Sequence, residues 1–520
     1  MPWGPVLELR NHPRMDPMTR PSPLSSLCLV GAALLALPLA ACGGGESPTD
    51  PESGTQETAA EGQAKKKRPV ILISIDSLRA DFTSPYGHVP AYAPEEITTP
   101  FLSSMAEEGV LFEHTSASSS WTLPSHITML TGMAPMEHGI RSRKYSLHEG
   151  IPMISNVFQD DGYHTGGFFT APFLHPAWGF HRGFDVYIPA ADYLGTIEAG
   201  EALAAHGRSQ TVEDIHHKSH TDNRTGEQAI DRAIGWLKQE ERYEDPFFLF
   251  VHLWDPHYDY FPPEDYRKRF LPMDSPVVGD ELMRKDRELT TLELDHLKAL
   301  YEAEIRYTDD QIARLYAQLE EWGIADDVIL AVVSDHGDEF MEHGNTGHHL
   351  TLLEEVIHVP MVIQAPGLID GGQRVNGSVS IADLAPTLID LAGLPGWPER
   401  SGKSMRPLWE EEDVDFEVSL DLYRPTLKMN LMGYRKGMKK GIQDFRKNLL
   451  RIYDLETDPK ELNATVTNIT VEDPFIQGLA AFLIRLQETP APVHHVREAV
   501  EITDLLSELG YVDDTVENED

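Results

Sequence analysis

The sequence predicts an α/β fold, in which a doubly wound and mostly parallel sheet carries helices on both faces and a small α+β subdomain follows at the C-terminus. Short, continuously apolar segments, typical of strands buried on both faces, alternate with longer segments of helical periodicity. Two of these apolar segments end in an acidic residue, Asp76 and Asp335. From about Asp415 the pattern changes to short strand-like segments, which indicates the separate subdomain.

Four apolar segments are predicted as strands of the sheet: Val70–Asp76, Phe247–Leu253, Val328–Ser334 and Met361–Ile363. Helices are predicted between them, near residues 96–109, 222–240, 292–322 and 381–392. In the C-terminal part, a last helix is predicted at Val496–Leu509, before an acidic tail. Doubly wound sheets bind ligands outside the carboxyl ends of their strands, so Asp76 and Asp335 are the first candidate site residues.

Composition and charge exclude several classes of protein. The chain has 520 residues, of which 41% are apolar and 24% charged, as in ordinary globular proteins. The 43 Lys and Arg residues against 84 Asp and Glu give a net charge of −41, which repels polyanions, so no nucleic-acid partner is expected. Both cysteines, Cys28 and Cys42, lie near the N-terminus, which leaves His, Asp and Glu as ligands for a metal elsewhere.

The N-terminal segment is predicted to be a targeting signal, residues 1–41. Its apolar part, Leu27–Ala41, is short for a membrane span and follows the arginines Arg10, Arg14 and Arg20. The segment Leu39–Cys42 resembles the lipobox of bacterial lipoproteins. The resemblance implies cleavage before Cys42 and lipidation of Cys42, and therefore an extracytoplasmic protein that is lipid-anchored in the bacterial cell envelope. The alternative is a free thiol at Cys42 after an ordinary signal peptide.

Residues 42–67 are predicted to be a flexible tether, because they are rich in Gly, Ser, Thr, Pro and Glu and contain almost no apolar side chains. The predicted boundaries of the folded part are a catalytic domain at residues 68–414 and a C-terminal subdomain with its acidic tail at residues 415–520.

Asp76, Asp335 and His336 are candidate metal ligands. A carboxylate is costly to bury without a partner, and two strand ends with an adjacent imidazole form a compact ligand set. The imidazole favours zinc or manganese over calcium. In the alternative interpretation, the two aspartates are N-caps of the helices that follow.

Thr122 is predicted to lie at the positive end of a helix. Pro124 favours the first helical turn, the helix is expected to run from Pro124 to Thr131, and Gly132 is expected to end it. An anion is stabilised at such a helix end. The alternative is that Thr122 is an ordinary N-cap.

Four segments together resemble the sulfatase family of the alkaline phosphatase superfamily: Ile75–Asp81, Trp121–His126 with Leu130–Gly132, Trp254–His257, and Ser334–Glu339 with His343 and His348. The resemblance extends from about Arg68 to Tyr453–Pro459, and Leu505–Tyr511 is similar to the family's usual ending. It implies a metal-dependent hydrolase of sulfate or phosphate esters.

The resemblance also implies roles for single residues. Thr122 takes the position of the nucleophile and binds the metal together with Asp76, Asp335 and His336. His126 would support the nucleophile. His257 and His348 would bind the transferred group or protonate the leaving oxygen, the alternative being structural loop histidines. A second metal bound by Asp255, His257 and His348 remains an open possibility.

One position departs from the sulfatase pattern. Sulfatases carry Cys or Ser where Thr122 stands and oxidise it to formylglycine, and they have Arg where His126 stands. Thr cannot form that aldehyde, so formylglycine is not expected. A Thr nucleophile resembles the phosphodiesterases and phosphoethanolamine transferases of the superfamily, which are the alternative within the enzyme class. A non-catalytic surface lipoprotein that binds a ligand is the alternative outside it.

Overall fold

The computed structural model describes residues 66–190, 224–275, 289–410, 416–425, 427–467, 473–488 and 494–495. The predicted signal peptide, Cys42, nearly all of the tether, the predicted helix Val496–Leu509 and the acidic tail lie outside these residues. Residues 65–520 form one compact unit, separate from residues 1–64. Among the described residues, no helix is both long enough and apolar enough to cross a membrane.

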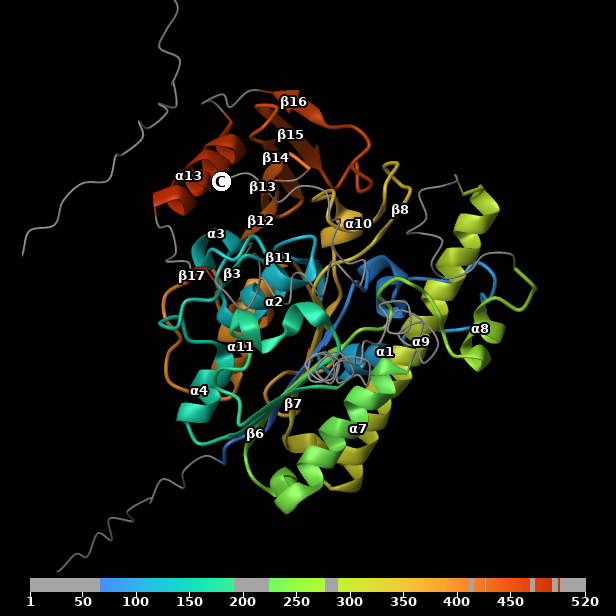
Figure 1. Cartoon of the computed structure of the whole chain (residues 1–520), viewed down its shortest axis with the longest axis vertical. Coiled ribbons are helices and arrows are strands. Elements are labelled where there is room, and N and C mark those ends of the chain that lie inside the picture. The colour runs from blue at the N-terminus through green and yellow to red at the C-terminus, as the bar shows by residue number, and fades with distance from the viewer. Residues whose placement is uncertain are drawn as a thin grey trace, which may run out of the picture. The chain divides into compact units, whose positions relative to one another are not determined.

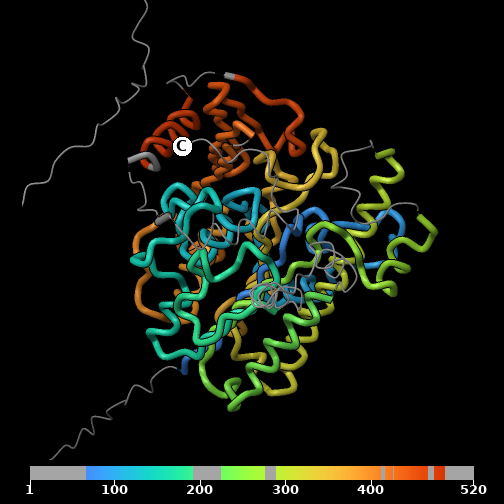
Figure 2. Tube along the Cα trace, viewed as in Figure 1, coloured from blue at the N-terminus to red at the C-terminus, as the bar shows by residue number. Residues whose placement is uncertain are grey.

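Eight strands form the main sheet in the described part of the chain, in the order β11-β2-β10-β7-β1-β6-β4-β5. At its centre β1 lies parallel to both β6 and β7, although the three segments are far apart in sequence (Figure 2). The strands are β1 Val70–Ile75, β2 Val110–Ser116, β4 His164–Phe169, β5 Val186–Pro189, β6 Phe247–Leu253, β7 Ile329–Ser334, β10 Met361–Gln364 and β11 Gln373–Ser380.

The predicted fold class is confirmed, with one correction. β10 was predicted as a strand of a parallel sheet, but it runs antiparallel to both β2 and β7. Its apolar residues indicated burial on both faces and carried no signal of direction. The sheet is therefore mixed around β10 and parallel at its centre.

Alternation along the central strands divides the core into two layers. Even-numbered residues of β1 pack with one set of helices, and odd-numbered residues pack with another. The helices of the even-numbered face are α2 Thr122–Thr131, α4 Ile154–Asp160 and α11 Leu384–Leu391. Those of the odd-numbered face are α1 Pro100–Glu108, α7 Thr225–Lys238 and α9 Thr291–Glu321 (Figure 1).

A five-stranded antiparallel meander with helix α13 follows, drawn in orange to red in Figure 1. Its elements are β12 Glu417–Arg424, β13 Met429–Lys436, β14 Lys439–Asp444, β15 Leu449–Asp454, β16 Thr465–Thr467 and α13 Pro474–Glu488. The shorter elements of the chain are α3 Pro135–His138, α8 Glu264–Phe270, α10 Glu354–Ile357, α12 Pro407–Glu410, β3 Tyr145–Ser146, β8 Glu339–Phe340, β9 Thr346–Gly347 and β17 His494–His495.

Buried charges join the meander to the catalytic part. Glu354 of α10 accepts hydrogen bonds from Arg435 at 3.1 Å and from Lys440 at 2.8 Å. Lys440 also pairs with Glu461 at 2.6 Å. Although burial opposes ionisation, Lys440 and Arg435 hold the pKa of Glu354 below its usual value. Removing one partner would leave a buried charge uncompensated, so this network fixes the two parts to each other.

Candidate active site

The strand ends converge on the face that α2 covers. In β1, Ser74 follows the even-numbered core residues, and Asp76 comes next in the same alternation. In β6, His252 occupies the place that Ser74 occupies in β1. In β7, the same alternation runs through Val333 to Asp335. Because neighbouring parallel strands end at the same edge of the sheet, the four side chains lie close together, all of them fully buried.

Asp335 has one satisfied oxygen and one unsatisfied oxygen. Its Oδ1 accepts hydrogen bonds from the backbone N–H groups of Ser77, at 3.2 Å, and His336, at 2.9 Å. Ser77 reaches this place from a left-handed backbone conformation, with φ +50°. The Oδ2 of Asp335 and both carboxylate oxygens of Asp76 are buried with no hydrogen-bond partner among the described residues. A role as helix N-caps would therefore leave three of the four carboxylate oxygens of the two aspartates without a partner.

His336 turns a ring nitrogen towards the unpaired oxygens. Its Nε2 lies 3.5 Å from Oδ1 of Asp76 and 3.4 Å from Oδ2 of Asp335. Its Nδ1 donates to the carbonyl of Gly337 at 3.2 Å, so in the neutral ring Nε2 carries a lone pair. Gly337 is required here because a Cβ would collide with the carbonyl of Glu355.

Burial raises the pKa of both aspartates well above the usual range. The charge of Asp338 adds to this at Asp76, and the charge of Asp76 adds to it at Asp335. Burial lowers the pKa of His336. A divalent cation between the two carboxylates and the imidazole would supply the missing partner for all three groups. Asp76, Asp335 and His336 thus fit a metal of the kind that accepts oxygen and nitrogen ligands.

Thr122 is the first residue of α2, and Trp121 occupies the N-cap position without a capping side-chain bond. The N-cap alternative for Thr122 is therefore wrong. Its Oγ1 is 3.4 Å from Nε2 of His336, so the hydroxyl lies beside the ligand set at the positive end of the helix. As predicted, the helix ends at Gly132, whose φ is +64°.

His126 lies one turn after Thr122, but its ring nitrogens are already engaged. Its Nδ1 donates to the carbonyl of Thr122 at 2.9 Å, and its Nε2 pairs with the hydroxyl of Ser74 at 2.8 Å. Nδ1 is also 3.4 Å from Oδ2 of Asp335. Burial holds its pKa well below the usual value. His126 therefore contacts the backbone of the nucleophile position and a candidate ligand, and its catalytic role stays a prediction.

His257 and His348 lie together on the other side of His336. The ring centres of His336 and His348 are 4.3 Å apart, and those of His348 and His257 are 5.1 Å apart. Nδ1 of His348 contacts Oδ1 of Asp338 at 2.6 Å. Burial lowers the pKa of both His257 and His348 to about 3. Each ring is thus neutral before an anion is bound.

Asp255 does not join this group. Its Oδ2 accepts hydrogen bonds from the hydroxyl of Thr225, at 2.7 Å, and from the N–H of Gly226, at 2.9 Å, both at the start of α7. The carboxylate near the two histidines is Asp338, which sequence reasoning missed although it stands two residues after His336. The structure brings His336, Asp338 and His348 together as a second group with possible ligand atoms.

His252 was also missed. Its Nε2 is 3.3 Å from Oδ2 of Asp76 and has no hydrogen-bond partner in the described part of the chain. Its Nδ1 contacts the hydroxyl of Thr170 at 3.1 Å. The available signal was a lone His in an apolar strand, on the same alternation as Phe248 and Phe250.

Comparisons with known proteins identify similar sequences and similar folds. The sequence model of the Sulfatase family matches residues 68–394, and the one described as N-sulphoglucosamine sulphohydrolase, C-terminal, matches residues 342–489. An arylsulfatase from Clostridium perfringens is 26% identical over 466 residues, covering 77% of this chain and 91% of the relative.

Solved structures share the fold. The phosphonate monoester hydrolase of Agrobacterium radiobacter superposes with a TM-score of 0.63 at 22% identity, covering 81% of this chain and 96% of that protein. BT4656 in complex with its substrate D-glucosamine-2-N,6-O-disulfate superposes with a TM-score of 0.61 at 18% identity, covering 87% of this chain and 100% of that protein. With a family match over more than half its length, the chain belongs to the sulfatase family of hydrolases.

Proposed function

We propose that this protein hydrolyses sulfate or phosphate esters with Thr122 as the nucleophile and a divalent metal bound by Asp76, Thr122, Asp335 and His336. One observation carries the proposal. Three buried carboxylate oxygens without hydrogen-bond partners face the same space as Nε2 of His336, with the hydroxyl of Thr122 at its edge. Zinc or manganese suits this mixed oxygen and nitrogen set better than calcium.

A divalent metal held by Asp76, Thr122, Asp335 and His336 would supply positive charge that lowers the pKa of the Thr122 hydroxyl and stabilises the charge of the transferred group. Oγ1 of Thr122 attacks sulfur or phosphorus, and the bond to the leaving alcohol oxygen breaks. Water then cleaves the bond to Oγ1, which restores threonine and releases sulfate or phosphate. The N-terminal end of α2 stabilises negative charge on the group while it is attached.

The leaving alcohol needs a proton, which His257 or His348 donates. Each ring uses Nδ1 for a protein oxygen, namely the carbonyl of Tyr258 or the carboxylate of Asp338. This leaves Nε2 for the substrate. An anionic ester beside these rings raises their lowered pKa values, so proton uptake accompanies substrate binding. His257→Gln and His348→Gln identify the donor, because losing it slows esters of weakly acidic alcohols more than those of acidic ones.

Initial rates on an aryl sulfate, an aryl phosphate and an aryl phosphodiester, with metal analysis of the protein, test the proposal. Thr122→Val keeps the shape but lacks the hydroxyl, and it should lose about 10³-fold or more in kcat. Thr122→Ser is the matched control and should retain measurable turnover. Full activity of Thr122→Val, or of metal-free protein, would refute the mechanism.

Phosphodiester hydrolysis or transfer is the second candidate, favoured by the threonine itself. A sulfatase that uses formylglycine needs Cys or Ser at this position, and Thr122 offers neither. A rate on the diester above that on the sulfate ester would select this candidate. The similarity to an arylsulfatase supports the sulfate ester instead.

We further propose that the protein is lipid-anchored through Cys42 on the extracytoplasmic side of the bacterial cell envelope. The order of arginines, apolar segment and Leu39–Cys42 supports this proposal. Metabolic labelling with palmitate should mark the full chain. Cys42→Ala should lose the label and leave the membrane fraction, whereas an unlabelled wild-type chain would refute the anchor.

A further inference from the structure

Asp338 and His348 face each other at the open end of a short hairpin. Its strands β8 and β9 pair antiparallel, with Glu339 opposite Gly347. Asp338 comes directly before β8 and His348 directly after β9, so the same register brings these two residues together. Nδ1 of His348 lies 2.6 Å from Oδ1 of Asp338. Because a carboxylate oxygen accepts, Nδ1 carries the proton of this hydrogen bond.

The carboxylate of Asp338 is itself held in place. Its Oδ2 accepts a hydrogen bond from the hydroxyl of Tyr260 at 3.0 Å. Tyr260 is fully buried, and its ring packs against the rings of Tyr301 and Phe340. The backbone carbonyl of Asp338 accepts a hydrogen bond from the guanidinium of Arg79 at 2.9 Å. The carboxylate therefore cannot turn without losing a hydrogen bond.

The contact between Asp338 and His348 fits a hydrogen bond better than a shared metal ion. Two ligand atoms bound to one zinc ion at about 2.0–2.1 Å lie about 3 Å or more apart. The two atoms here are 2.6 Å apart. His336, the third member of this group, turns its Nε2 towards Asp76 and Asp335 instead. Asp338 thus serves to hold the ring of His348.

The two candidate proton donors differ in what holds their rings. Nδ1 of His257 contacts the carbonyl of Tyr258, the next residue of its own loop. Nδ1 of His348 contacts a carboxylate ten residues away, which is anchored in turn by other parts of the chain. A hydrogen bond to a carboxylate is also stronger than one to a neutral carbonyl. The ring of His348 is therefore the more firmly oriented of the two.

His348 also lies close to the proposed nucleophile. Nε2 of His336 is 3.4 Å from Oγ1 of Thr122, and the ring centre of His336 is 4.3 Å from that of His348. On another side, the ring of Tyr258 stacks on His348, with centres 5.0 Å apart. Packing and the bond at Nδ1 together fix the ring of His348 beside the ligand set.

We propose that Asp338 is a positioning residue, which fixes the ring of His348 and so makes His348, rather than His257, the proton donor to the leaving alcohol. The proton on Nε2 passes to the alcohol oxygen as the bond from that oxygen to sulfur or phosphorus breaks. The proton on Nδ1 stays in its bond to Asp338, which does not touch the substrate. This inference rests on the proposed ester hydrolysis.

The first test compares a phenyl ester with the 4-nitrophenyl ester of the same acid, using the full chain at saturating metal. Asp338→Ala should lower kcat/KM about 10²-fold or more for the phenyl ester, whose alcohol needs a proton, and less than about 5-fold for the other. Tyr260→Phe should show the same selective loss at about 3–10-fold. Asp309→Ala, at another buried aspartate, is the control and should slow neither ester. Equal losses of Asp338→Ala on both esters would overturn the proposal.

A double substitution tests whether Asp338 acts through His348. In a His348→Gln background, Asp338→Ala should cause no further loss on the phenyl ester, because the ring that it holds is already absent. A full further loss in that background would contradict the proposal. So would a selective loss on the phenyl ester in His257→Gln that is missing in His348→Gln.

Nitrogen NMR of isotope-labelled histidines gives a readout that needs no turnover. The signals of His348, identified by their absence in His348→Gln, should show a protonated Nδ1 near neutral pH, and Asp338→Ala should give a mixture of tautomers. If wild-type protein hydrolyses no ester but the signal depends on Asp338, the proposed function fails and the positioning of the ring stands. If it hydrolyses esters and the signal is the same in Asp338→Ala, the positioning role fails alone.

Discussion

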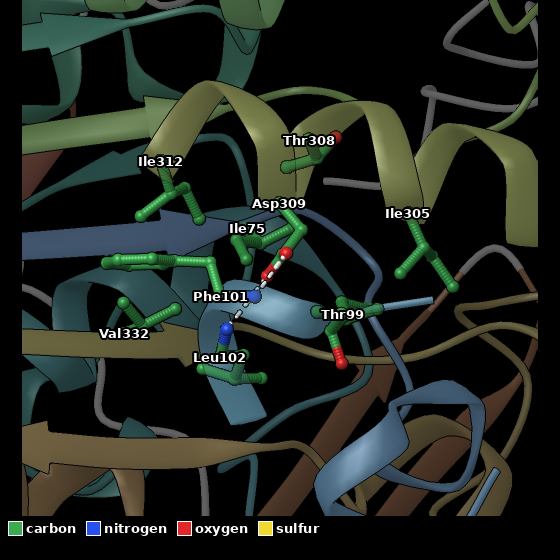
Figure 3. A pocket seen from close by; sticks show the side chains of 10 residues that line it. Ile75, Thr99, Phe101, Leu102, Ile305, Thr308, Asp309, Ile312 and Val332 are labelled. Carbon is green, nitrogen blue, oxygen red and sulfur yellow. Dashed lines mark hydrogen bonds between the residues drawn. The ribbon is translucent and has the colours of Figure 1, made fainter. Parts of the chain in front are cut away.

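Buried aspartates on the two faces of the central sheet differ in their hydrogen bonds: Asp309 of α9 lies on one face, and Asp76 and Asp335 follow strands on the other. Ile75 and Asp76 are neighbours, but Ile75 points into the face under α1 and α9, and Asp76 points into the face under α2. Figure 3 shows the pocket of the first face, lined mostly by apolar side chains, with Asp309 bonded to two backbone N–H groups. On the second face, three oxygens of Asp76 and Asp335 lack such partners.

The difference separates a carboxylate that caps a helix from the two carboxylates of the proposed metal site. Asp309 accepts hydrogen bonds from the N–H groups of Phe101, at 2.7 Å, and Leu102, at 3.0 Å, which satisfies the start of α1. Asp76 and Asp335 satisfy no helix end with their unpaired oxygens, and they lie close to a hydroxyl and an imidazole. The pocket between α1 and α9 thus holds a carboxylate bonded to two N–H groups, whereas Asp76 and Asp335 keep unpaired buried oxygens beside Thr122 and His336.

The largest expected effect is the difference in activity between aspartate substitutions on the two faces of the sheet. Asp335→Asn should lower kcat/KM about 10²–10³-fold or more, because a metal ligand and a charge are lost. The metal-free variant should melt no lower than metal-free wild type, because the amide keeps an oxygen for the N–H groups of Ser77 and His336 and carries no charge that burial disfavours. Asp309→Asn is the matched control and should keep its activity. Equal losses in the two variants, measured by initial rates, would contradict the comparison.

The second effect is a pH dependence of metal stabilisation. Asp76 and Asp335 have folded-state pKa values raised above the ordinary 3.8, so their protons stabilise the metal-free fold. That contribution is complete below the unfolded pKa and is lost as pH rises through the folded values. A bound metal replaces the protons, so the gain in melting temperature from metal over chelator should grow from about pH 5 to about pH 8. A constant gain would argue against metal binding at these carboxylates.

A smaller effect is expected at His252, which touches Asp76 from β6. His252→Ala should weaken metal affinity about 10–100-fold, because the imidazole that lies 3.3 Å from Oδ2 of Asp76 is removed from the edge of the ligand set. Titration calorimetry measures this directly. Thr165→Ala in the neighbouring strand β4 serves as a control for packing changes. Unchanged metal affinity in His252→Ala would show that His252 does not contribute to metal binding.

The smallest effect concerns stability alone. Asp309→Ala leaves two N–H groups at the start of α1 unpaired, which should lower the free energy of unfolding by about 1–2 kcal/mol. Chemical denaturation measures this loss. Activity per folded molecule should remain unchanged, since the side chain lies on the opposite face from Thr122. A fall in the activity of fully folded Asp309→Ala protein would show that the two faces of the sheet are coupled.

The sequence allowed prediction of the parts that depend on local pattern. The central strands, Thr122 at the start of a helix and the acidic strand ends all follow from apolar alternation and turn residues close by in the chain. The antiparallel direction of β10 could not be predicted, because a short apolar strand buried on both faces has the same composition in either direction.

The missed site residues depend on tertiary contacts. Asp255 and Asp338 both stand beside a motif histidine, and only the fold assigns one to the cap of α7 and the other to His348. The strand β12 begins beyond the predicted end of the catalytic domain, and its Asp421 bonds to Ser118 and Ser119. Sequence alone offered no means of pairing that strand with these two serines.

The buried Glu354–Lys440–Glu461 network has a consequence for how the chain can vary. Glu354 comes directly before Glu355, whose carbonyl limits residue 337 to glycine beside His336. Loss of the meander by proteolysis would remove Arg435 and Lys440 from Glu354 and expose this segment to water, so the turn at Gly337 and the adjoining site should be destabilised when the meander is cut away.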